Sequence, residues 1–331
     1  MKILGRNVTA HNVINRVRFE ATGLKAKSLG RSITFVRTQE LIDWSRAWAK
    51  ELPRHDVVVG IPRSGLIPAI AMAYEMDVPF STPELLAQHQ GFKATEGLLA
   101  QVSEAITSGT SDKDLENMIT SSSEQLPIYQ VSDTILLVDD TANTGGAMDR
   151  VRALMPADKV VTCASVIGTK EYRRDGWHYY KMLPRDRFGE WNFTTIDFSR
   201  SVSDMDGLLC VDAPLPSLSP GEDYLKVYET WIAEAEPRFI PHGPVGTIIT
   251  ARAEKYRKMT EQWLAEHNVT YGQLLMETTQ DQRIVFINKM KVRPTFVLES
   301  DIGHARKIWK RTGIPTFCTD SMQIYSRGSD S

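Results

Sequence analysis

Residues 134–146 read TILLVDDTANTGG, and this stretch decides the fold of the first half of the chain. The apolar run at 134–138 is typical of a buried strand, and residues 147–155 continue with helical spacing. Between them, Asp139 and Asp140 end the strand, and Gly145 and Gly146 open the helix. Backbone N–H groups at such a junction can hold a phosphate, because glycine has no side chain to interfere. The two carboxylates can accept hydrogen bonds from a diol and stabilise a developing positive charge.

The same pattern occurs again on either side of this stretch. Residues 56–61 form a short apolar run that ends in Pro62-Arg63-Ser64-Gly65, and residues 66–76 follow with helical spacing. Residues 159–166 form another apolar run. Strands that alternate with helices predict a parallel sheet, and therefore an α/β fold.

The two loops together resemble those of type I phosphoribosyltransferases, which use magnesium and the sugar phosphate PRPP. The resemblance implies that Asp139 and Asp140 are catalytic carboxylates at the ribose and that Arg63, Ser64 and Gly65 contact pyrophosphate. It also implies that the rest of the first loop binds substrate phosphate, namely Thr141, Ala142, Asn143, Thr144, Gly145 and Gly146. The alternative is an acidic strand end followed by an ordinary turn, but the match of both loops favours the resemblance.

Two positions depart from the pattern of that family. Ala147 stands where many members have Thr or Ser, which removes a hydroxyl donor from the phosphate loop. Asn143 stands where purine-salvage members have an acidic residue that acts as a base. Because an amide cannot take a proton, proton removal from the acceptor must occur in another way. This argues against a simple hypoxanthine or guanine salvage enzyme.

Two further segments of the first half have expected roles near the acceptor. Residues 187–192 resemble the base-side segment of the family, and Trp191 is the predicted ring that stacks on the acceptor, with a packed core tryptophan as the alternative. Residues 91–130 contain polar stretches that predict a mobile insertion. This insertion is expected to be either a lid over the site or a surface segment without a catalytic role.

A second acidic motif opens the other half of the chain. Asp204 and Asp206 are two residues apart, so in an extended segment both carboxylates face one side and can reach the same phosphate. The motif resembles the first motif of haloacid-dehalogenase-like (HAD) phosphatases, in which one carboxylate attacks phosphorus and the other protonates the leaving oxygen. The strand ends at Thr250 and at residues 296–301 resemble later motifs of the same superfamily.

The second resemblance implies a second site with its own metal. Thr250 would bind phosphate, and Lys289, or Lys291 close by, would be the lysine that the family needs. Magnesium, a hard cation that prefers oxygen ligands, would be held by Asp204, Asp206, Glu299 and Asp301. The alternative is a catalytically inactive domain, because the strand before Asp204 is more polar than a buried parallel strand usually is.

Length and composition limit the remaining possibilities. The 331 residues are predicted to form two doubly wound parallel-sheet domains, a transferase at 1–198 with an N-terminal extension and a HAD-like phosphatase at 199–331. A net charge of −2 argues against a nucleic-acid partner. No apolar run approaches the roughly 20 residues of a membrane span, so we expect a cytoplasmic protein with no membrane partner. Three isolated cysteines at no metal-ligand spacing are expected to be reduced.

The resulting hypothesis is a bifunctional enzyme of nucleotide metabolism. The first domain would transfer phosphoribosyl from PRPP to a nucleobase-like acceptor, and the second would remove a phosphate from that product or from a related nucleotide. The expected partners are therefore small molecules, and a homodimer is compatible with this class. One alternative is a regulatory protein that binds PRPP or nucleotide without catalysis. The other is a nucleic-acid end phosphatase, which would need a basic groove beside Asp204, built from Arg252, Lys255, Arg257 and Lys258.

Overall fold

The computed structural model describes residues 33–127, 133–213 and 222–327. These residues divide into two compact units, one at Thr34–Phe193 and one formed by the described residues from Thr194 onward together with Ile33. The boundary drawn from the sequence falls slightly later, after residue 198, and the N-terminal extension at 1–32 lies outside the described residues. Each unit has its own sheet with helices around it.

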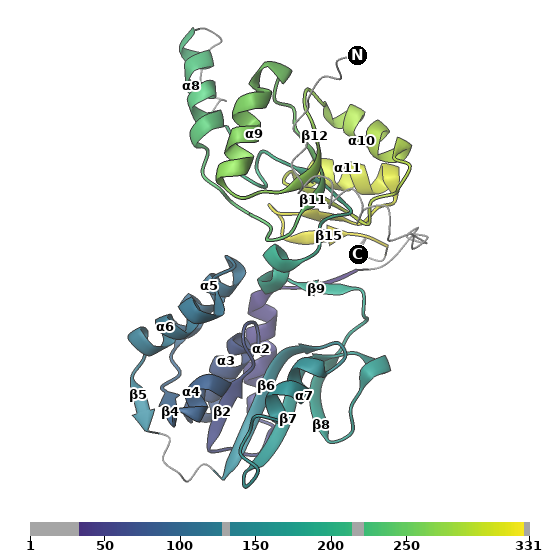
Figure 1. Cartoon of the computed structure of the whole chain (residues 1–331). Helices are drawn as coiled ribbons and strands as arrows, with labels where there is room; N and C mark the ends of the chain where they lie inside the picture. The colour runs from purple at the N-terminus through teal and green to yellow at the C-terminus, as the bar shows by residue number, and fades with distance from the viewer. Residues whose placement is uncertain (1–32, 128–132, 214–221, 328–331) are drawn as a thin grey trace, which may run out of the picture. The chain divides into compact units, whose positions relative to one another are not determined.

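The first unit is built on a seven-stranded sheet with the order β5-β4-β3-β2-β6-β7-β8 (Figure 1). Its strands are β2 (Val57–Gly60), β3 (Phe80–Ser81), β4 (Gln90–Phe92), β5 (Gln125–Pro127), β6 (Thr134–Ala142), β7 (Val160–Gly168) and β8 (Trp177–Met182). A separate pair joins β1 (Thr34–Val36) to β9 (Arg187–Gly189). The helices are α2 (Thr38–Ala49), α3 (Leu66–Met76), α4 (Pro83–Ala87), α5 (Glu96–Thr107), α6 (Asp112–Ser122) and α7 (Gly146–Arg152), with short 3-10 turns η1 (Lys170–Tyr172) and η2 (Glu190–Thr195).

The central strands of this sheet run parallel, which confirms the prediction of a parallel α/β fold. Strands β3, β2, β6, β7 and β8 pair in parallel, whereas β4 pairs antiparallel with both β3 and the edge strand β5. Alternate residues of a strand face opposite sides of the sheet. Val58 and Leu136 pack with α2, α3 and α5, whereas Val57 and Leu137 pack with Met148 of α7 on the other face. Because helices cover both faces of the sheet, the side chains that can reach a ligand are expected in the loops at the strand ends.

The segment at 91–130 contains two regular helices, α5 and α6, in place of an irregular loop. Thr95 caps α5, since its hydroxyl oxygen accepts a 3.1 Å hydrogen bond from the backbone N–H of Leu98. Leu98, Val102 and Ile106 repeat every four residues and are buried in the same core as α3. Apolar spacing on one helix face therefore anchors the segment, while residues 128–130 lie outside the described residues.

The second unit has a six-stranded sheet with the order β12-β11-β10-β13-β14-β15. The strands are β10 (Ser201–Asp204), β11 (Val245–Ile249), β12 (Tyr271–Leu275), β13 (Phe296–Glu299), β14 (Thr316–Cys318) and β15 (Gln323–Tyr325). All neighbours pair in parallel except β14 and β15. The chain moves outward from β10 in one direction through β11 and β12 and in the other through β13 and β14. In such open sheets, ligands bind beyond the carboxyl ends of the strands at the point where the order reverses.

Helices cover both faces of the second sheet as well. They are α8 (Glu222–Glu234), α9 (Arg257–Glu266), α10 (Gln280–Lys289) and α11 (Ile302–Thr312), with the 3-10 turn η4 (Glu254–Tyr256) before α9. Figure 1 shows α8 and α9 on one side of this sheet and α10 and α11 on the other. Val202 and Val297 of the sheet pack against Ile287 of α10 and Ile308 of α11.

Two properties of the described chain concern its environment. In the described part of the chain, no helix combines the length and the apolarity needed to cross a bilayer. Cys163, Cys210 and Cys318 are buried and form no disulfide.

Candidate functional site

Two loops of the first unit leave the same edge of its sheet. Strands β2 and β6 are parallel neighbours with Gly60 paired to Val138, so the loops after them begin side by side. The hydroxyl of Ser64 donates a 2.7 Å hydrogen bond to Oδ1 of Asp140. This contact joins the loop predicted to bind pyrophosphate to the carboxylates predicted to bind ribose.

Glycine is required at one position in each loop. A Cβ on Gly65 would lie 2.5 Å from the carbonyl oxygen of Ile61, a separation that real Cβ atoms do not show. Gly145 has a φ of +81°, and a Cβ there would lie 2.8 Å from the ring of Trp177. Thr141 and Ala142 end β6, while Asn143 and Thr144 lead to Gly145, which is the residue before the first turn of α7. At these two positions the backbone of each loop therefore packs too closely against its neighbours to leave room for a side chain.

The two carboxylates at the end of β6 have different surroundings. Asp139 is buried, and burial, with the neighbouring charge of Asp140 as a second cause, raises the pKa of Asp139 well above its usual range. Oδ1 of Asp139 accepts a 3.0 Å hydrogen bond from the backbone N–H of Asp140. The carboxylate of Asp140 accepts from Ser64 on one oxygen and from the indole N–H of Trp191 on the other, at 2.8 Å. Both oxygens of Asp140 are thereby held in one orientation.

Trp191 belongs to the core of the first unit. Its side chain is 1% exposed, and its ring lies against the backbone of Gly189, where a Cβ would come within 2.5 Å of the indole. Of the two roles considered from the sequence, the packed core tryptophan matches this position. A ring with no exposed face has no surface on which an acceptor base can stack, so in this structure its contact with the site is the hydrogen bond to Asp140.

A second residue of the same segment holds the middle of the phosphate loop. Nη2 of Arg187 donates to Oδ1 of Asn143 and to the hydroxyl of Thr169, both at 3.0 Å. Nη1 donates to the backbone carbonyls of Leu183 and Pro184. We call the contacts of Arg187 with Asn143 and of Trp191 with Asp140 the loop clamp, because they fix the loop at two points from β9 and η2.

Arginines also approach the two loops. Nη2 of Arg174 donates to the carbonyl oxygen of Thr144 at 3.3 Å and to Asp149 at 3.0 Å, next to the position where Ala147 removes a hydroxyl. Nη1 of Arg63 donates to the carbonyl oxygen of Thr110, which lies between α5 and α6. The predicted pyrophosphate loop is thus tied to the segment that was considered as a lid. Arg174 was not predicted, and its place at the loop depends on the fold of η1 and β8, which no local pattern indicates.

The second unit brings several predicted residues to the carboxyl edge of its sheet. Asp204 ends β10, Asp206 follows it, Thr250 follows β11 and Glu299 ends β13. The hydroxyl of Thr250 donates a 3.0 Å hydrogen bond to Oδ2 of Asp206. Because β10 lies between β11 and β13, the strand order brings these side chains to one place. Their spacing along the chain does not indicate this.

A buried arginine that the sequence analysis missed joins two of these carboxylates. Arg283 of α10 donates to both oxygens of Asp204 at 2.9 Å and to Oε2 of Glu299 at 2.5 Å. Burial acts to lower the pKa of Arg283, but the charges of Asp204 and Glu299 outweigh burial and raise it. Burial, together with the charge of Asp204, raises the pKa of Glu299 well above its usual range. Arg283 therefore occupies the position between the acidic strands for which Lys289 was predicted.

Arg252 is the second buried cation of this edge. Its side chain forms an ion pair of 2.7 Å with Oδ1 of Asp206, and its guanidinium lies 4.5 Å from the centre of the Trp231 ring. Arg252 is 1% exposed, so it cannot line a basic groove for nucleic acid as the alternative function required. Arg257, another member of that predicted groove, is paired with Glu254.

The remaining predicted residues of the second site lie apart from this group. Asp301 is exposed and caps α11 by accepting from the backbone N–H of His304 at 2.7 Å. Lys289 is exposed at the end of α10, whereas Arg283 lies on the buried face of the same helix. In the described ranges, no group of three or more His, Cys, Asp or Glu side chains is arranged to hold a metal.

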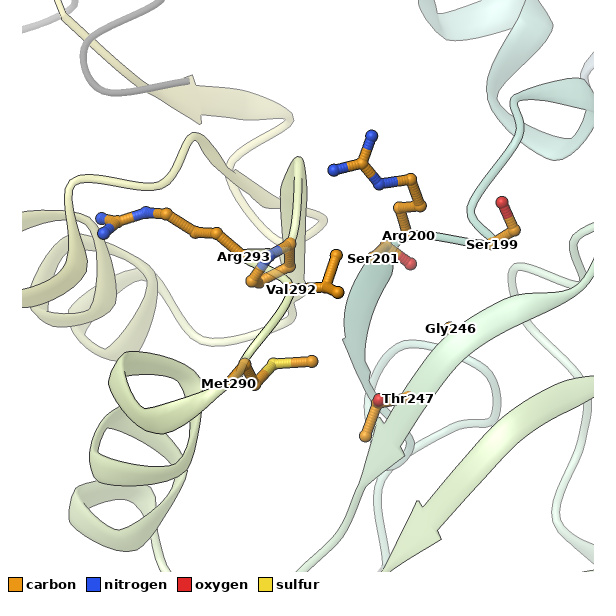
Figure 2. Close-up of a pocket in the computed structure, with 9 residues that line it drawn as sticks. Ser199, Arg200, Ser201, Gly246, Thr247, Met290, Val292 and Arg293 are labelled. Atoms are coloured by element: carbon orange, nitrogen blue, oxygen red, sulfur yellow. The ribbon is translucent and has the colours of Figure 1, made fainter. Parts of the chain in front are cut away.

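The predicted magnesium ligands therefore do not fit a metal in this arrangement. The oxygens of Asp204 are bonded to Arg283, and those of Asp206 are bonded to Arg252 and Thr250. Figure 2 shows a small pocket of about 10 Å³ in the same unit, lined in part by Ser201, Gly246 and Val292. This pocket lies at the amino ends of β10 and β11, at the opposite edge from Asp204, and contributes nothing to the carboxylate group.

Comparison with known proteins adds independent findings. Residues 34–202 match the family model described as phosphoribosyl transferase domain. The comparison with curated proteins gave no match. Solved structures similar to the chain include a purine phosphoribosyltransferase from Pyrococcus horikoshii Ot3, with 16% identity, a TM-score of 0.30, and coverage of 49% of this chain and 94% of that one. They also include the Helicobacter pylori xanthine-guanine-hypoxanthine phosphoribosyltransferase, with 13% identity, a TM-score of 0.32, and coverage of 49% and 93%. A third is a hypothetical protein from Neisseria gonorrhoeae with bound ppGpp, with 13% identity, a TM-score of 0.31, and coverage of 49% and 91%.

Proposed function

Since the phosphoribosyl transferase domain matches residues 34–202 of the 331, the protein belongs to this family, and on that premise we propose that its first unit transfers phosphoribosyl from PRPP to a heterocyclic acceptor. The observation that carries the proposal is the hydrogen bond between Ser64 and Asp140, which links the two loops expected to hold pyrophosphate and ribose. PRPP contains both groups, joined at the carbon where the bond breaks.

Each loop has a role in this proposal. Asp139 and Asp140 accept from the ribose hydroxyls and stabilise the positive charge that develops on the sugar ring. The backbone from Thr144 to Gly146 holds the 5′-phosphate, with Arg174 close by. The loop around Arg63 holds the pyrophosphate, which enters the site as its magnesium complex. Magnesium is thus part of the substrate, where it offsets the charge of the leaving pyrophosphate.

The test is release of pyrophosphate from PRPP and Mg²⁺ across a panel of purine, pyrimidine and pyridine bases. The double variant Asp139→Asn/Asp140→Asn is expected to release none, and Asp175→Asn, which changes an exposed carboxylate of the same unit, is the matched control. Binding of PRPP with no pyrophosphate release from any base would refute transfer. That result would instead favour the regulatory protein.

For the second unit we propose a phosphohydrolase of HAD type that acts on the nucleotide product or on a related nucleotide. The supporting observation is the grouping of Asp204, Asp206 and Thr250 at the strand ends, with Arg283 as the cation beside Asp204. In this proposal Asp204 attacks phosphorus to form an aspartyl-phosphate, which requires one of its oxygens to leave Arg283.

Phosphate release from a panel of nucleoside monophosphates tests this second activity. Asp204→Asn is expected to abolish release, whereas Asp281→Asn, an exposed carboxylate on α10, is expected to leave it unchanged. If no nucleotide is hydrolysed by the unmodified protein, the second unit is a catalytically inactive domain.

A further inference from the structure

We propose that the acceptor of the transferase unit carries a negative charge, and that Arg187 is the residue that selects it. The inference rests on the proposed transferase function and names its substrate class.

Arg187 is half-buried, and the groups that accept its hydrogen bonds are all neutral. They are the side-chain oxygens of Asn143 and Thr169 and the backbone carbonyls of Leu183 and Pro184. Among the described residues, the arginines in ion pairs are others, such as Arg174 with Asp149 and Arg238 with Asp320, and Arg187 forms none. Its Nε–H is buried and has no hydrogen-bond partner there. A partly buried cation without a direct ion pair is available to pair with an incoming anion.

The charges near Arg187 do not already neutralise it. Burial lowers the pKa of Arg187, and the more distant carboxylates of Asp140 and Glu171 act in the opposite direction with smaller effect. Asp140 directs its two oxygens to Ser64 and Trp191. Asp140 and Glu171 thus partly offset the charge of Arg187 without pairing with it, and the guanidinium presents its positive charge to Asn143.

The position of this field matters because of Asn143. The resemblance to phosphoribosyltransferases implies an acidic residue here in purine-salvage members, where it takes a proton from a neutral base. Here an amide takes its place, and a cation is bonded directly to that amide. The charge beside the acceptor is therefore positive where a negative group was expected. A cation disfavours transfer of a proton to this side of the site, and it favours an acceptor that is already anionic.

The transfer step balances without a protein base when the acceptor is anionic. A nitrogen lone pair of the heterocycle attacks C1′ of PRPP and forms the N–C1′ bond. The C1′–O bond breaks, and its electron pair leaves with pyrophosphate. A nicotinate-like acceptor attacks through a pyridine-type nitrogen that carries no proton, with the charge on its carboxylate. Where the attacking nitrogen carries an N–H, as in an orotate-like ring, that proton passes to the departing pyrophosphate. Nothing is oxidised or reduced, and no protein group has to take a proton.

Matched pairs of acceptors test the proposal. Pyrophosphate release is measured with orotate against uracil, nicotinate against nicotinamide, and xanthine against hypoxanthine across the pH range in which xanthine ionises. We expect the anionic member of at least one pair to be preferred by about tenfold or more, as for a charge-assisted contact. Preference for an orotate-like or nicotinate-like acceptor identifies a carboxylate, and preference that appears only as xanthine ionises identifies a ring anion.

Substitution of Arg187 separates charge recognition from a structural role. Arg187→Gln is expected to reduce the anionic-to-neutral ratio to near one, and Arg187→Lys to retain part of it. The ratio within one variant is independent of how much of the protein is folded, so partial unfolding does not obscure the result. Arg185→Gln, two residues away and exposed, is the matched control and should keep the ratio.

Three results would overturn the inference. The first is preference for the neutral members of all pairs, and the second is an unchanged ratio in Arg187→Gln. Both leave the transferase function intact. The third, no release with any acceptor, removes the transferase function and this inference with it, so the two failures are distinguishable.

Discussion

Replacing Trp191 by Phe removes one hydrogen bond from Asp140 and keeps an aromatic ring in the core. The lost bond is 2.8 Å long and ends on a carboxylate that is 3% exposed, so water does not readily replace the indole N–H. Hydrogen bonds to charged groups contribute about 1.5–3 kcal/mol. If the bond is needed to orient Asp140 toward the ribose, kcat/KM for PRPP falls by about 10- to 150-fold, at 1.36 kcal/mol for each factor of ten.

The assay is pyrophosphate release at varied PRPP concentration, with urea denaturation of the same variants. Trp48→Phe is the control, because Trp48 is a buried tryptophan in the same core, whereas the side-chain donors to Asp140 are Ser64 and Trp191. We expect both variants to lose stability and only Trp191→Phe to lose transfer. The decrease should appear mainly in kcat if Asp140 acts in the transition state, and mainly in KM if it acts only in binding PRPP.

One outcome would refute this reasoning. If Trp191→Phe and Trp48→Phe lose similar stability and keep similar kcat/KM, the hydrogen bond does not position Asp140 for catalysis. The contact would then contribute only to the packing of η2 on the core.

The remaining predictions concern buried charges. The raised pKa of Asp139 means that its contribution to stability is fully present below the unfolded value of 3.8 and is lost as pH rises through the folded pKa. The stability of Asp139→Asn relative to the unmodified protein should therefore increase with pH in denaturation series above pH 4, and a constant difference would contradict the assignment. Arg283→Met leaves Asp204 and Glu299 without their cation and should destabilise the second unit by about 3–5 kcal/mol. Lys289→Met on the exposed face of the same helix should change stability by less than about 0.5 kcal/mol, and equal effects of the two changes would show that the ion pairs contribute little.

The central strands β2, β6 and β7 of the first unit, and the loops after β2 and β6, were predictable because their signals are local. An apolar run, two acids and a pair of glycines stand next to one another at 134–146, and the periodicity changes from strand to helix within a few residues. The hydrogen bond between Ser64 and Asp140 was not predicted, although parallel neighbours place their carboxyl ends at one edge of the sheet. What the sequence did not indicate was the orientation of Trp191, whose partner is 51 positions away.

The second unit shows the same limit more clearly. The carboxylates at the strand ends were predicted, but the cation that joins them was assigned to Lys289. Six residues separate Lys289 from Arg283, which puts the two side chains on different faces of a helix with 3.6 residues per turn. Arg283 adjoins Ile284 and precedes Ile287 by four positions, so a charged residue on the apolar face of the helix was the signal to follow. A search by residue type favoured lysine, whereas helical spacing favours Arg283.

The loop clamp also determines at what stage of synthesis the site can be completed. The chain is synthesised from its amino terminus, so Asp140 is present 51 positions before the indole that holds it. A nascent chain that ends before residue 187 contains both substrate loops and lacks both arms of the clamp. The last residues of the first unit therefore complete its site, immediately before synthesis reaches β10. Until then the emerging carboxylate lacks its indole partner, which delays a functional transferase until nearly the whole unit has been made.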